Sequence, residues 1–582
     1  MTTGQSAPAT GRSAPAPDPG EGPPTRWRPS RVSMTQGRNG TVSPRHGMVA
    51  LPALASGVGL ALSLPPWGWW NLALPAAGLL WWRLGGLRPR TRLWAGWLAG
   101  LGCYVPGLMW VRSFTLPGAV VLIAIEAFFV ALACWVVPAG PPVARALAFP
   151  AAMTLAEAAR ATWPFGGLPI GGVFLGQAGG PLLGVARLGG PLGLTLAVYV
   201  GGVGLAALVE GTARAVRDGA RAHAFARSDP GSSDLPAPDS GEGRPGVVAG
   251  AVAGLGVFLA VGVVALGVLA GTAVAADHAP DGGSPVGTLT TAAVQGGGVR
   301  GFRKSQVDPA VVLAAQLAAD RLMVLQDHAV TPRLVLWPED VVSLDTALAD
   351  SPEEAVLSDL ARTLDSTLVV GVTEDVSATA FRNEVVAWGP DGALVSRFEK
   401  VHRVPFGEYV PYRGFFAHLG SLTAVPRDAV PGTGSGLLPT PAGPLGALIS
   451  YEVFFASRGR ASVRDGAELL IVPTNTSSYA TAQVPTQEVA AATVQAVEQG
   501  RDLLQAAPTG YSVAITNRGD LLERSVLGDR QVVPATLSRR AGWTVYVRFG
   551  DGPPLGLAAV ALLAGWLLAA RRRRTNRPSP RR

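Results

Sequence analysis

Runs of apolar residues are the feature that most constrains how this chain folds. A helix needs about 20 apolar residues to cross the ~30 Å hydrocarbon core of a bilayer. A hydrophobic fraction of 48% and a charged fraction of only 15% over 582 residues indicate a membrane protein that also carries a soluble domain. The apolar runs predict eight membrane helices, at 49–66, 67–83, 93–112, 117–139, 143–160, 184–209, 247–276 and 553–570.

The arginines next to these runs predict which way the helices cross the membrane. Short loops rich in Lys and Arg stay in the cytoplasm. Arg83 to Arg92, Arg145 and the run Arg571 to Arg574 all lie on one side if both chain ends are cytoplasmic. We therefore expect a multi-pass protein of the plasma membrane, with the segment between the seventh and eighth helices on the extracytoplasmic face. The same arginines account for the net charge of +8, so we expect no nucleic-acid partner.

These signals divide the chain into a membrane part, a soluble part and polar tails. The first residues are rich in Pro, Gly, Ser and Thr and lack the apolar run of a signal peptide, so we expect a disordered tail there. The divisions that we expect are a cytoplasmic tail at 1–47, a membrane domain at 48–279 with a cytoplasmic linker at 211–246, an extracytoplasmic domain at 285–545, a transmembrane helix at 553–570 and a basic cytoplasmic tail at 571–582.

The chain has only two cysteines, and both lie in predicted membrane helices. Cys103 and Cys134 therefore predict no disulfide and no thiolate metal site in the soluble domain. The six histidines show no spacing that is typical of a zinc site. We expect neither a metal nor another cofactor.

The segment 285–545 alternates predicted strands and helices, which is typical of an α/β domain. Glu339, Lys400 and Ser450 come at the ends of three of the predicted strands. Because such folds build their sites at strand ends, we expect these three side chains to form one site. The strands are predicted at 287–294, 333–337, 367–373, 384–388, 394–398, 445–450 and 468–472, and helices at 308–329 and 352–363.

The residues around these three strand ends resemble three sequence blocks of the nitrilase superfamily. The blocks are Val335-Leu-Trp-Pro-Glu339, Arg397-Phe-Glu-Lys-Val-His-Arg-Val-Pro-Phe-Gly-Glu-Tyr-Val-Pro411 and Leu448-Ile-Ser-Tyr-Glu452. The second block, a Lys and a His followed by Val-Pro-Phe-Gly-Glu and Tyr-Val-Pro, is especially similar to the apolipoprotein N-acyltransferase family. Glu157, Arg160 and the Gly- and Pro-rich loop at 164–169 resemble the membrane part of that family.

The resemblance implies both a fold and a reaction. The fold is a polytopic α-helical membrane domain of about eight helices joined to a nitrilase-type αββα sandwich. The reaction moves a fatty acyl chain from a membrane phospholipid to the N-terminal amino group of an apolipoprotein whose first cysteine carries diacylglycerol. The implied partners are therefore a phospholipid, an apolipoprotein and the membrane. In some relatives a polyprenol-phosphate mannosyltransferase is fused to the enzyme or works beside it, so such a partner is also conceivable.

By the same resemblance, Glu339 is the general base and Lys400 is the positive charge at the oxyanion of the tetrahedral intermediate. Ser450 carries the acyl group as an ester in a two-step ping-pong reaction. The resemblance also gives supporting roles. Glu408 would orient Lys400 or assist proton transfer, and the pocket would be shaped by Tyr451 and Glu452. The candidate substrate-binding residues are Phe302, Asn475 and Tyr479.

Two positions depart from the family. Ser450 stands where the family has its cysteine nucleophile. A thiol is a few per cent ionised near neutrality, whereas a hydroxyl needs strong activation by a neighbouring base. A serine nucleophile is chemically feasible, because Ser-Lys arrangements exist on other folds. The second departure lies between residues 295 and 304, where relatives often have a substrate-binding Trp and this chain has Phe302.

Several alternatives stay open. Taken singly, Glu339 is also compatible with a solvated acid, Lys400 with a surface lysine and Ser450 with a buried residue bound to a backbone carbonyl. The protein could be a catalytically silent homologue that binds lipid or lipoprotein as a scaffold, or a membrane-tethered amidase for a small substrate. Glu126, an acid inside the fourth apolar run, could be protonated, contact a helix partner such as Arg160, or bind lipid.

Overall fold

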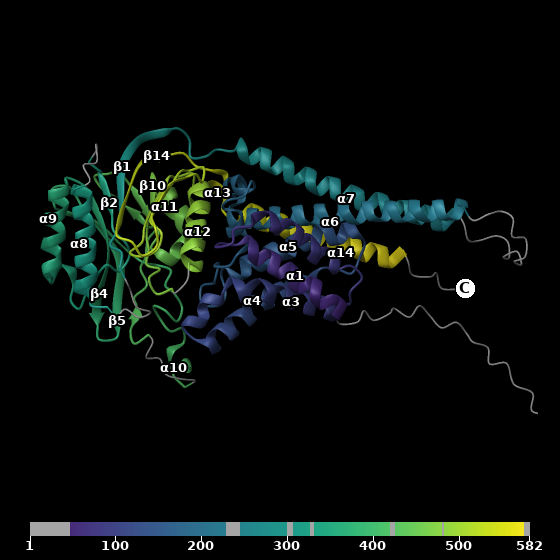
Figure 1. Ribbon diagram of the computed structural model, residues 1–582, viewed down its shortest axis with the longest axis horizontal. Helices are drawn as coiled ribbons and strands as arrows, with labels where there is room; N and C mark the ends of the chain where they lie inside the picture. Colours follow the sequence, from purple (N-terminus) through teal and green to yellow (C-terminus); the bar gives the residue numbers. More distant parts are fainter. Residues whose placement is uncertain are drawn as a thin grey trace, which may run out of the picture. The chain divides into compact units, whose positions relative to one another are not determined.

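The computed structural model describes residues 47–227, 245–298, 307–325, 331–418, 425–479 and 482–575. Their elements form a helical part, drawn towards the right of Figure 1, and an α/β part with two sheets, drawn towards the left. Phe302, one of the candidate substrate-binding residues, lies outside the described residues.

Each predicted membrane segment contains one α-helix, or most of one, within the described residues. Four of these helices, α4, α6, α7 and α14, contain stretches long and apolar enough to cross a membrane. Helix α1 is apolar but shorter. The helices are α1 (Gly47–Ser63), α2 (Ala73–Arg83), α3 (Pro89–Gly107), α4 (Leu116–Val136), α5 (Pro142–Arg160), α6 (Ala186–Arg227), α7 (Pro245–Asp277) and α14 (Gly552–Thr575).

The predicted helix at 67–83 is shorter in the structure. Helix α2 begins only at Ala73, and a short 3-10 helix, Trp70–Leu72, precedes it. Gly68 prevents a continuous helix there, because its φ of +66° is a left-handed conformation that favours glycine. With 11 residues, α2 alone is too short to span the ~30 Å of a bilayer core.

The predicted cytoplasmic linker at 211–246 begins as helix. Helix α6 continues to Arg227, because the added residues include several Ala and Arg, which favour helix, and no proline. Glu210 forms an ion pair of 2.6 Å with Arg214, one turn further along the same helix. The first part of the predicted linker, up to Arg227, is therefore helical in the structure.

Small residues let the membrane helices pack closely. At Gly57 a side chain would come within 1.9 Å of the carbonyl oxygen of Ala99. At Gly100 a side chain would come within 2.6 Å of the Cα atom of Ala127. Glycine is therefore required where α1 crosses α3 and where α3 crosses α4, as is common between membrane helices.

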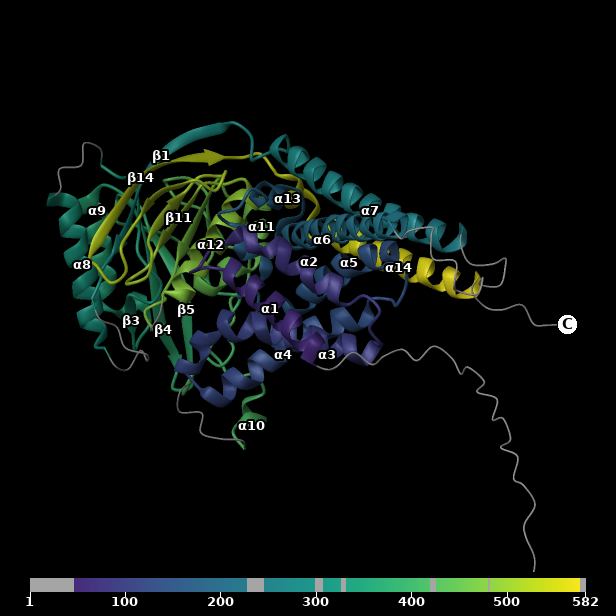
Figure 2. The same cartoon turned by 45° about the vertical axis from the view of Figure 1, so that its right-hand side comes forward.

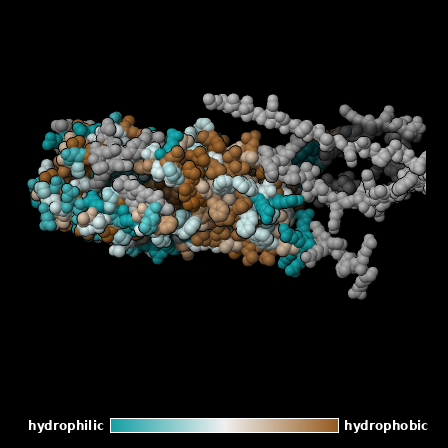
Figure 3. All heavy atoms as spheres, turned by 90° about the horizontal axis from the view of Figure 1, so that it is seen from below, coloured by the Kyte–Doolittle hydropathy of each residue, from teal (hydrophilic) through white to brown (hydrophobic). Residues whose placement is uncertain are grey.

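Apolar side chains cover the outside of the helical part. Figure 3 shows them in brown as a broad band, with hydrophilic side chains in teal over much of the α/β part and again at the far end of the helices. Leu116, Val120, Val263 and Leu567 are examples, and each is more than half exposed. An exposed apolar band of this kind is typical of a protein embedded in a membrane.

The α/β part contains two sheets. The strand order of the first is β14-β1-β2-β4-β5-β6, with β3 paired to β4 and β7 paired to β5. The order of the second is β13-β12-β11-β10-β9-β8. The strands of the first sheet are β1 (Pro285–Gln295), β2 (Leu334–Leu336), β3 (Val342–Leu344), β4 (Thr367–Ser377), β5 (Ala380–Trp388), β6 (Leu394–Glu399), β7 (Asp428–Ala429) and β14 (Gln531–Arg540). Those of the second are β8 (Leu437–Leu438), β9 (Leu445–Ala447), β10 (Leu469–Pro473), β11 (Leu503–Ala506), β12 (Val513–Ile515) and β13 (Leu521–Arg524).

The two sheets pack face to face, and helices cover both outer faces (Figure 1). Helices α8 (Pro309–Leu325) and α9 (Pro352–Leu364) cover the first sheet. Helices α11 (Ala456–Arg464) and α12 (Gln483–Gln499) cover the second. Buried apolar side chains such as Leu336, Val385 and Ile471 fill the space between the sheets. This arrangement is the αββα sandwich that the sequence predicts. Two short helices complete the α/β part, α10 (Arg413–Phe416) and α13 (Val545–Phe549).

Helix α12 joins the sandwich to the helical part, and Figure 2 shows it between the strands and the helices. Its apolar residues belong to the same buried core as residues of the membrane helices. The Nε2 atom of Gln483 donates hydrogen bonds to the carbonyls of Pro106, at 2.6 Å, and Gly107, at 3.1 Å. The side-chain oxygen of Gln487 accepts a hydrogen bond from the backbone N–H of Gly171 at 3.1 Å. The described residues accordingly form one compact unit.

Candidate active site

Lys400 and two glutamates form a charged cluster at the end of the first sheet, in which Lys400 and Glu339 are buried and Glu408 is partly exposed. Lys400 directly follows β6, Glu339 follows β2, and Glu408 lies in the loop after Lys400. The Nζ atom of Lys400 lies 2.7 Å from Oε1 of Glu339 and 2.6 Å from Oε1 of Glu408. Gly371 in β4 leaves room for this arrangement, because a side chain there would come within 2.5 Å of the Cα atom of Glu339.

Asn383 in β5 is a fourth member of this cluster, and our sequence analysis missed it. Its Nδ2 atom donates to Oε1 of Glu339 at 2.9 Å and to Oε1 of Glu408 at 3.2 Å. Its backbone carbonyl accepts a hydrogen bond from the N–H of Lys400 at 2.8 Å. Asparagine is rare inside strands, so an Asn at the start of an apolar strand was a usable signal.

The charges in this cluster suit proton transfer. Burial raises the pKa of Glu339, although Lys400 opposes this effect. Burial alone would lower the pKa of Lys400, but the two glutamates outweigh it and hold that pKa above its usual value. Lys400 therefore stays a cation at neutral pH, and Glu339 is a stronger base than an ordinary carboxylate.

Ser450 lies at a sharp turn that follows β9. It is the first residue of a short 3-10 helix, Ser450–Phe454, and its φ is +50°. A left-handed backbone is uncommon for a residue other than glycine and is often found at functional sites. Its hydroxyl makes no hydrogen bond to any of the described residues. The interpretation of Ser450 as a buried residue bound to a backbone carbonyl is therefore not supported.

Glu452 connects the Ser450 turn to the residues after Lys400. Its Oε1 atom accepts hydrogen bonds from the backbone N–H groups of Val401 and His402, both at 3.0 Å. Its Oε2 atom accepts from the N–H of Ile449 at 3.0 Å. This carboxylate is fully buried. It fixes the position of the Ser450 turn beside the Lys400 strand end, which is a more specific role than the predicted shaping of the pocket.

Tyr451 points towards the helical part. Its hydroxyl donates a hydrogen bond of 2.8 Å to the carbonyl of Gly167, in the loop between α5 and α6. Tyr409, which follows Glu408, donates in the same way to the carbonyl of Phe165 at 3.2 Å. One membrane loop therefore contacts the neighbours of two predicted site residues.

The candidate substrate-binding residues Asn475 and Tyr479 follow β10. The side-chain oxygen of Asn475 accepts hydrogen bonds from the backbone and the hydroxyl of Ser477, so it stabilises a local turn. The ring of Tyr479 packs edge to face against Trp110 and Phe114, with ring centroids 5.1 and 5.5 Å away. Tyr479 therefore contacts the helical part, whereas these hydrogen bonds of Asn475 are local.

Glu488 is a second residue that our sequence analysis missed. It lies on α12 with its side chain buried, and the hydroxyl of Thr474 donates a hydrogen bond to it. Burial raises its pKa to about 8. Glu488 directly precedes the apolar run Val489 to Ala492, and an acid beside such a run was the signal that could have identified it.

Glu126 contacts Arg160, one of the alternatives that the sequence left open. The Oε2 atom of Glu126 lies 2.7 Å from Nε of Arg160, and both side chains are 1% exposed. Glu126 therefore serves as an ion-pair partner inside the helical part.

Two sequence families match this chain. Residues 56–204 match the apolipoprotein N-acyltransferase N-terminal domain, and residues 290–540 match the carbon-nitrogen hydrolase family. The first of these matches covers most of the membrane helices, and the second covers the sandwich.

Full-length relatives match as well. An apolipoprotein N-acyltransferase of Mycolicibacterium smegmatis is 32% identical over 81% of this chain and 77% of that protein. One from Azotobacter vinelandii is 30% identical over 91% of this chain and 96% of that protein. Among solved structures, Saccharomyces cerevisiae Nit3 of the nitrilase superfamily has a TM-score of 0.34 and 21% identity, covering 44% of this chain and 91% of Nit3. An amidase from Nesterenkonia sp. has a TM-score of 0.33 and 20% identity, covering 44% of this chain and 91% of the amidase.

Proposed function

This chain belongs to the apolipoprotein N-acyltransferase family, and on that premise we propose that it N-acylates lipoproteins. The acyl chain comes from a membrane phospholipid, and the acceptor is the amino group of a diacylglyceryl-modified N-terminal cysteine. The observation that carries the proposal for this chain is the cluster of Glu408 with the buried pair Glu339 and Lys400, which Glu452 links to the turn of Ser450. Both substrates are lipids, so a sandwich attached to apolar helices suits them.

The first half-reaction transfers the acyl chain to Ser450. Glu339 takes the hydroxyl proton as the oxygen attacks the ester carbonyl of the phospholipid. The ammonium group of Lys400 stabilises the oxyanion of the tetrahedral intermediate. The intermediate collapses, the lysophospholipid oxygen leaves with the proton from Glu339, and an acyl ester remains on Ser450.

The second half-reaction transfers the acyl chain to the lipoprotein. The free amino group of the modified cysteine attacks the ester, and Glu339 accepts a proton from the attacking nitrogen. Lys400 again faces the oxyanion. The Ser450 oxygen leaves with the proton from Glu339, so the enzyme returns to its starting state and the product is an amide.

Two features support a serine in the position of the usual cysteine. A hydroxyl needs a stronger base than a thiol does, and burial raises the pKa of Glu339. The left-handed backbone of Ser450 resembles the strained turn that exposes a serine nucleophile in other acyl-transfer enzymes. Glu408 and Asn383 hold Lys400 and Glu339 in place.

We further propose that both chain ends are cytoplasmic and that the sandwich is extracytoplasmic, with eight passes through the membrane. Four helices meet the length and composition of a membrane span. The second pass would be the shortest, because residues 66–71 before α2 are exposed, and a bilayer accommodates a short span by thinning locally. We propose the same chain divisions that the sequence predicts, with the first part of the linker at 211–246 helical. A polyprenol-phosphate mannosyltransferase partner stays a prediction.

Mass spectrometry of a lipoprotein reporter tests the reaction, in a strain that lacks its own N-acyltransferase. The strain expresses the unaltered chain, Ser450→Ala or Ser450→Cys. We expect triacylated reporter with the unaltered chain and with Ser450→Cys, and none with Ser450→Ala. If Ser450→Cys alone acylates, the site is intact but the natural chain is silent, and a scaffold function would replace the proposal.

A further inference from the structure

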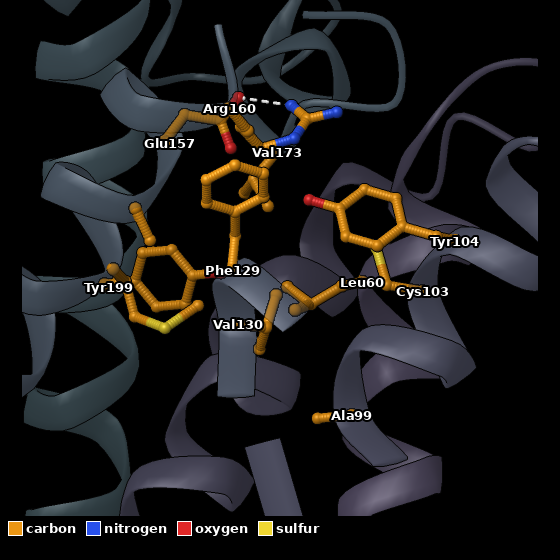
Figure 4. Close-up of a pocket in the computed structure, with 12 residues that line it drawn as sticks. Leu60, Ala99, Cys103, Tyr104, Phe129, Val130, Glu157, Arg160, Val173 and Tyr199 are labelled. Carbon is orange, nitrogen blue, oxygen red and sulfur yellow. Dashed lines mark hydrogen bonds and ion pairs between the residues drawn. The ribbon is translucent and has the colours of Figure 1, made fainter. Parts of the chain in front are cut away.

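A charged cluster lies inside the helical part, and its centre is Arg160 at the end of α5. Its guanidinium binds Glu126 of α4 through Nε and Glu157 of its own helix through Nη1, each at 2.7 Å. Figure 4 shows Arg160 and Glu157 together at one end of a cavity, with the ring of Tyr104 beside them. The guanidinium carbon lies 5.0 Å from the centre of that ring. Charges at membrane depth are costly and usually serve a function.

The remaining donors of Arg160 bind the loop between α5 and α6. Nη2 donates to the carbonyl of Ile170 at 2.7 Å, and Nη1 reaches the carbonyl of Pro169 at 3.5 Å. The backbone of Arg160 also accepts a hydrogen bond from the N–H of Leu168 at 2.8 Å. Because the guanidinium is planar and carries its donors in a fixed fork, these bonds fix the loop relative to α4 and α5.

The loop closes too tightly for any residue but glycine at one position. Gly167 has a φ of +91°, and a side chain there would come within 2.1 Å of the backbone of Ala161. Its N–H donates to the carbonyl of Pro164 at 2.8 Å. The carbonyl of Gly167 therefore has a defined direction, and it accepts the hydrogen bond from Tyr451 described above.

We propose that Arg160 is a positioning residue for acyl transfer, acting through the loop at 161–172. The loop accepts a hydrogen bond from Tyr451, which directly follows the nucleophile Ser450 in the chain. It accepts a second from Tyr409, which directly follows Glu408. Glu126 and Glu157 keep the guanidinium in the orientation that this requires. The inference rests on the proposed N-acylation. A displacement of reacting groups by about 1 Å can cost roughly 100-fold in rate, so contacts remote from the reacting atoms can control turnover.

A double-mutant cycle between Arg160 and Tyr451 tests this role. Arg160→Lys keeps the charge but loses the fork, and Tyr451→Phe loses only the hydroxyl. Transfer of the acyl chain from a fluorescent phospholipid to a diacylglyceryl-modified lipopeptide gives kcat and KM for each purified full-length chain. We expect Arg160→Lys to lower kcat roughly 10- to 100-fold with little change in KM. In the Tyr451→Phe background the same substitution should cost several-fold less, because one of the two contacts that it acts through is already lost.

Two further comparisons separate positioning from general damage. Glu126→Gln keeps an oxygen that accepts from Arg160, so it should retain most of the kcat, whereas Glu126→Ala should lose as much as Arg160→Lys. Arg145→Lys is the matched control, because Arg145 is a buried arginine of the same helix whose Nη1 donates to the carbonyl of Trp81. Its kcat should stay at that of the unaltered chain.

Three results would overturn the role of Arg160. The first is a double mutant whose loss in kcat equals the product of the two single losses. The second is an equal loss in kcat for Glu126→Gln and Glu126→Ala. The third is an Arg145→Lys chain with a kcat as low as that of Arg160→Lys. If Arg160→Lys does not fold, the cycle of Glu126→Ala with Tyr451→Phe replaces it. If the unaltered chain proves inactive, the same cycle in a Ser450→Cys background tests Arg160 separately from the serine.

Discussion

At the scale of single residues, the proposed reaction depends on the pKa of Glu339, its general base. Burial raises its pKa, while hydrogen bonds from Lys400 and Asn383 lower it. A hydrogen bond to the ionised form of a carboxyl always favours that form. Asn383 therefore limits how far the pKa of Glu339 rises, and it does so without adding charge to the cluster.

Removing this donor should change the pH dependence of the enzyme. In the proposed reaction Glu339 acts as a base only when it is ionised, so we expect kcat/KM to rise with pH through its pKa. In Asn383→Ala that pKa is higher, and the acid limb of the pH profile should move to higher pH. At neutral pH the rate should fall about tenfold, part of what a general base contributes. The measurement is kcat/KM for acyl-enzyme formation between pH 5 and 9.

Thr379→Ala is the control for this substitution, because Thr379 is an exposed residue next to the start of the same strand, β5. Its pH profile should match that of the unaltered chain. Asn383→Asp, which adds a negative charge beside Glu339, should move the limb in the same direction as Asn383→Ala. An Asn383→Ala enzyme that is slower at every pH, with its limb unmoved, would contradict the role given to Asn383.

At the scale of elements, α12 combines a packing role with a buried acid. Glu488 accepts a hydrogen bond from Thr474, and burial raises its pKa from 4.5 to about 8. Between those two pH values the unfolded chain ionises at this position while the folded chain keeps the proton. The folded state therefore loses stability as pH rises from about 4.5 to about 8, and the full cost applies above that range.

Replacing the acid by its amide should remove this cost. Glu488→Gln keeps an oxygen that accepts from Thr474 and has no proton to lose. We expect the variant to have a higher Tm than the unaltered chain at pH 8.5 and nearly the same Tm at about pH 5. Thermal unfolding in detergent at several pH values measures this. Equal differences in Tm at both ends of the range would show that Glu488 does not ionise there.

Local sequence patterns explain which elements were predictable. Strands β1, β4 and β5 are long runs of buried residues, and their patterns predicted them. Strand β12, Val513–Ile515, lies between Ser512 and Thr516, so its apolar run is shorter than those that marked β2 and β9. The edge strand β14 is recognisable mainly through its pairing with β1, from the other end of the domain.

The features of the site also divide into those that the sequence predicted and those that it did not. Glu339, Lys400 and Ser450 were recognised because the sequence around each resembles a family block. The contact between Tyr451 and Gly167 joins residues 284 positions apart, and no local pattern encodes such a distance. The left-handed turn at Ser450 was also unpredictable, because a serine does not require that conformation as a glycine often does.

At the scale of the whole molecule, the proposed orientation assigns opposite ends of the described part to opposite sides of the membrane. The α/β part lies beyond one end of the apolar band, and hydrophilic side chains lie beyond the other end (Figure 3). Helix α14 ends away from the α/β part (Figure 1), and its last turn contains Arg572, Arg573 and Arg574. Basic residues of this kind stay in the cytoplasm. The acyl acceptor must then be reached on the extracytoplasmic side, where the sandwich would lie.

Cysteine labelling in spheroplasts can test this orientation, because the natural cysteines, Cys103 and Cys134, are both buried. Ser377→Cys places a thiol at an exposed end of β4, and Thr575→Cys places one at the exposed end of α14. We expect a membrane-impermeant maleimide to label Ser377→Cys in intact spheroplasts and Thr575→Cys only after the membrane is permeabilised. The unaltered chain, as the control, should stay unlabelled in both conditions. Labelling of Thr575→Cys in intact spheroplasts, with Ser377→Cys protected, would invert the topology and place the acyl-transfer site in the cytoplasm.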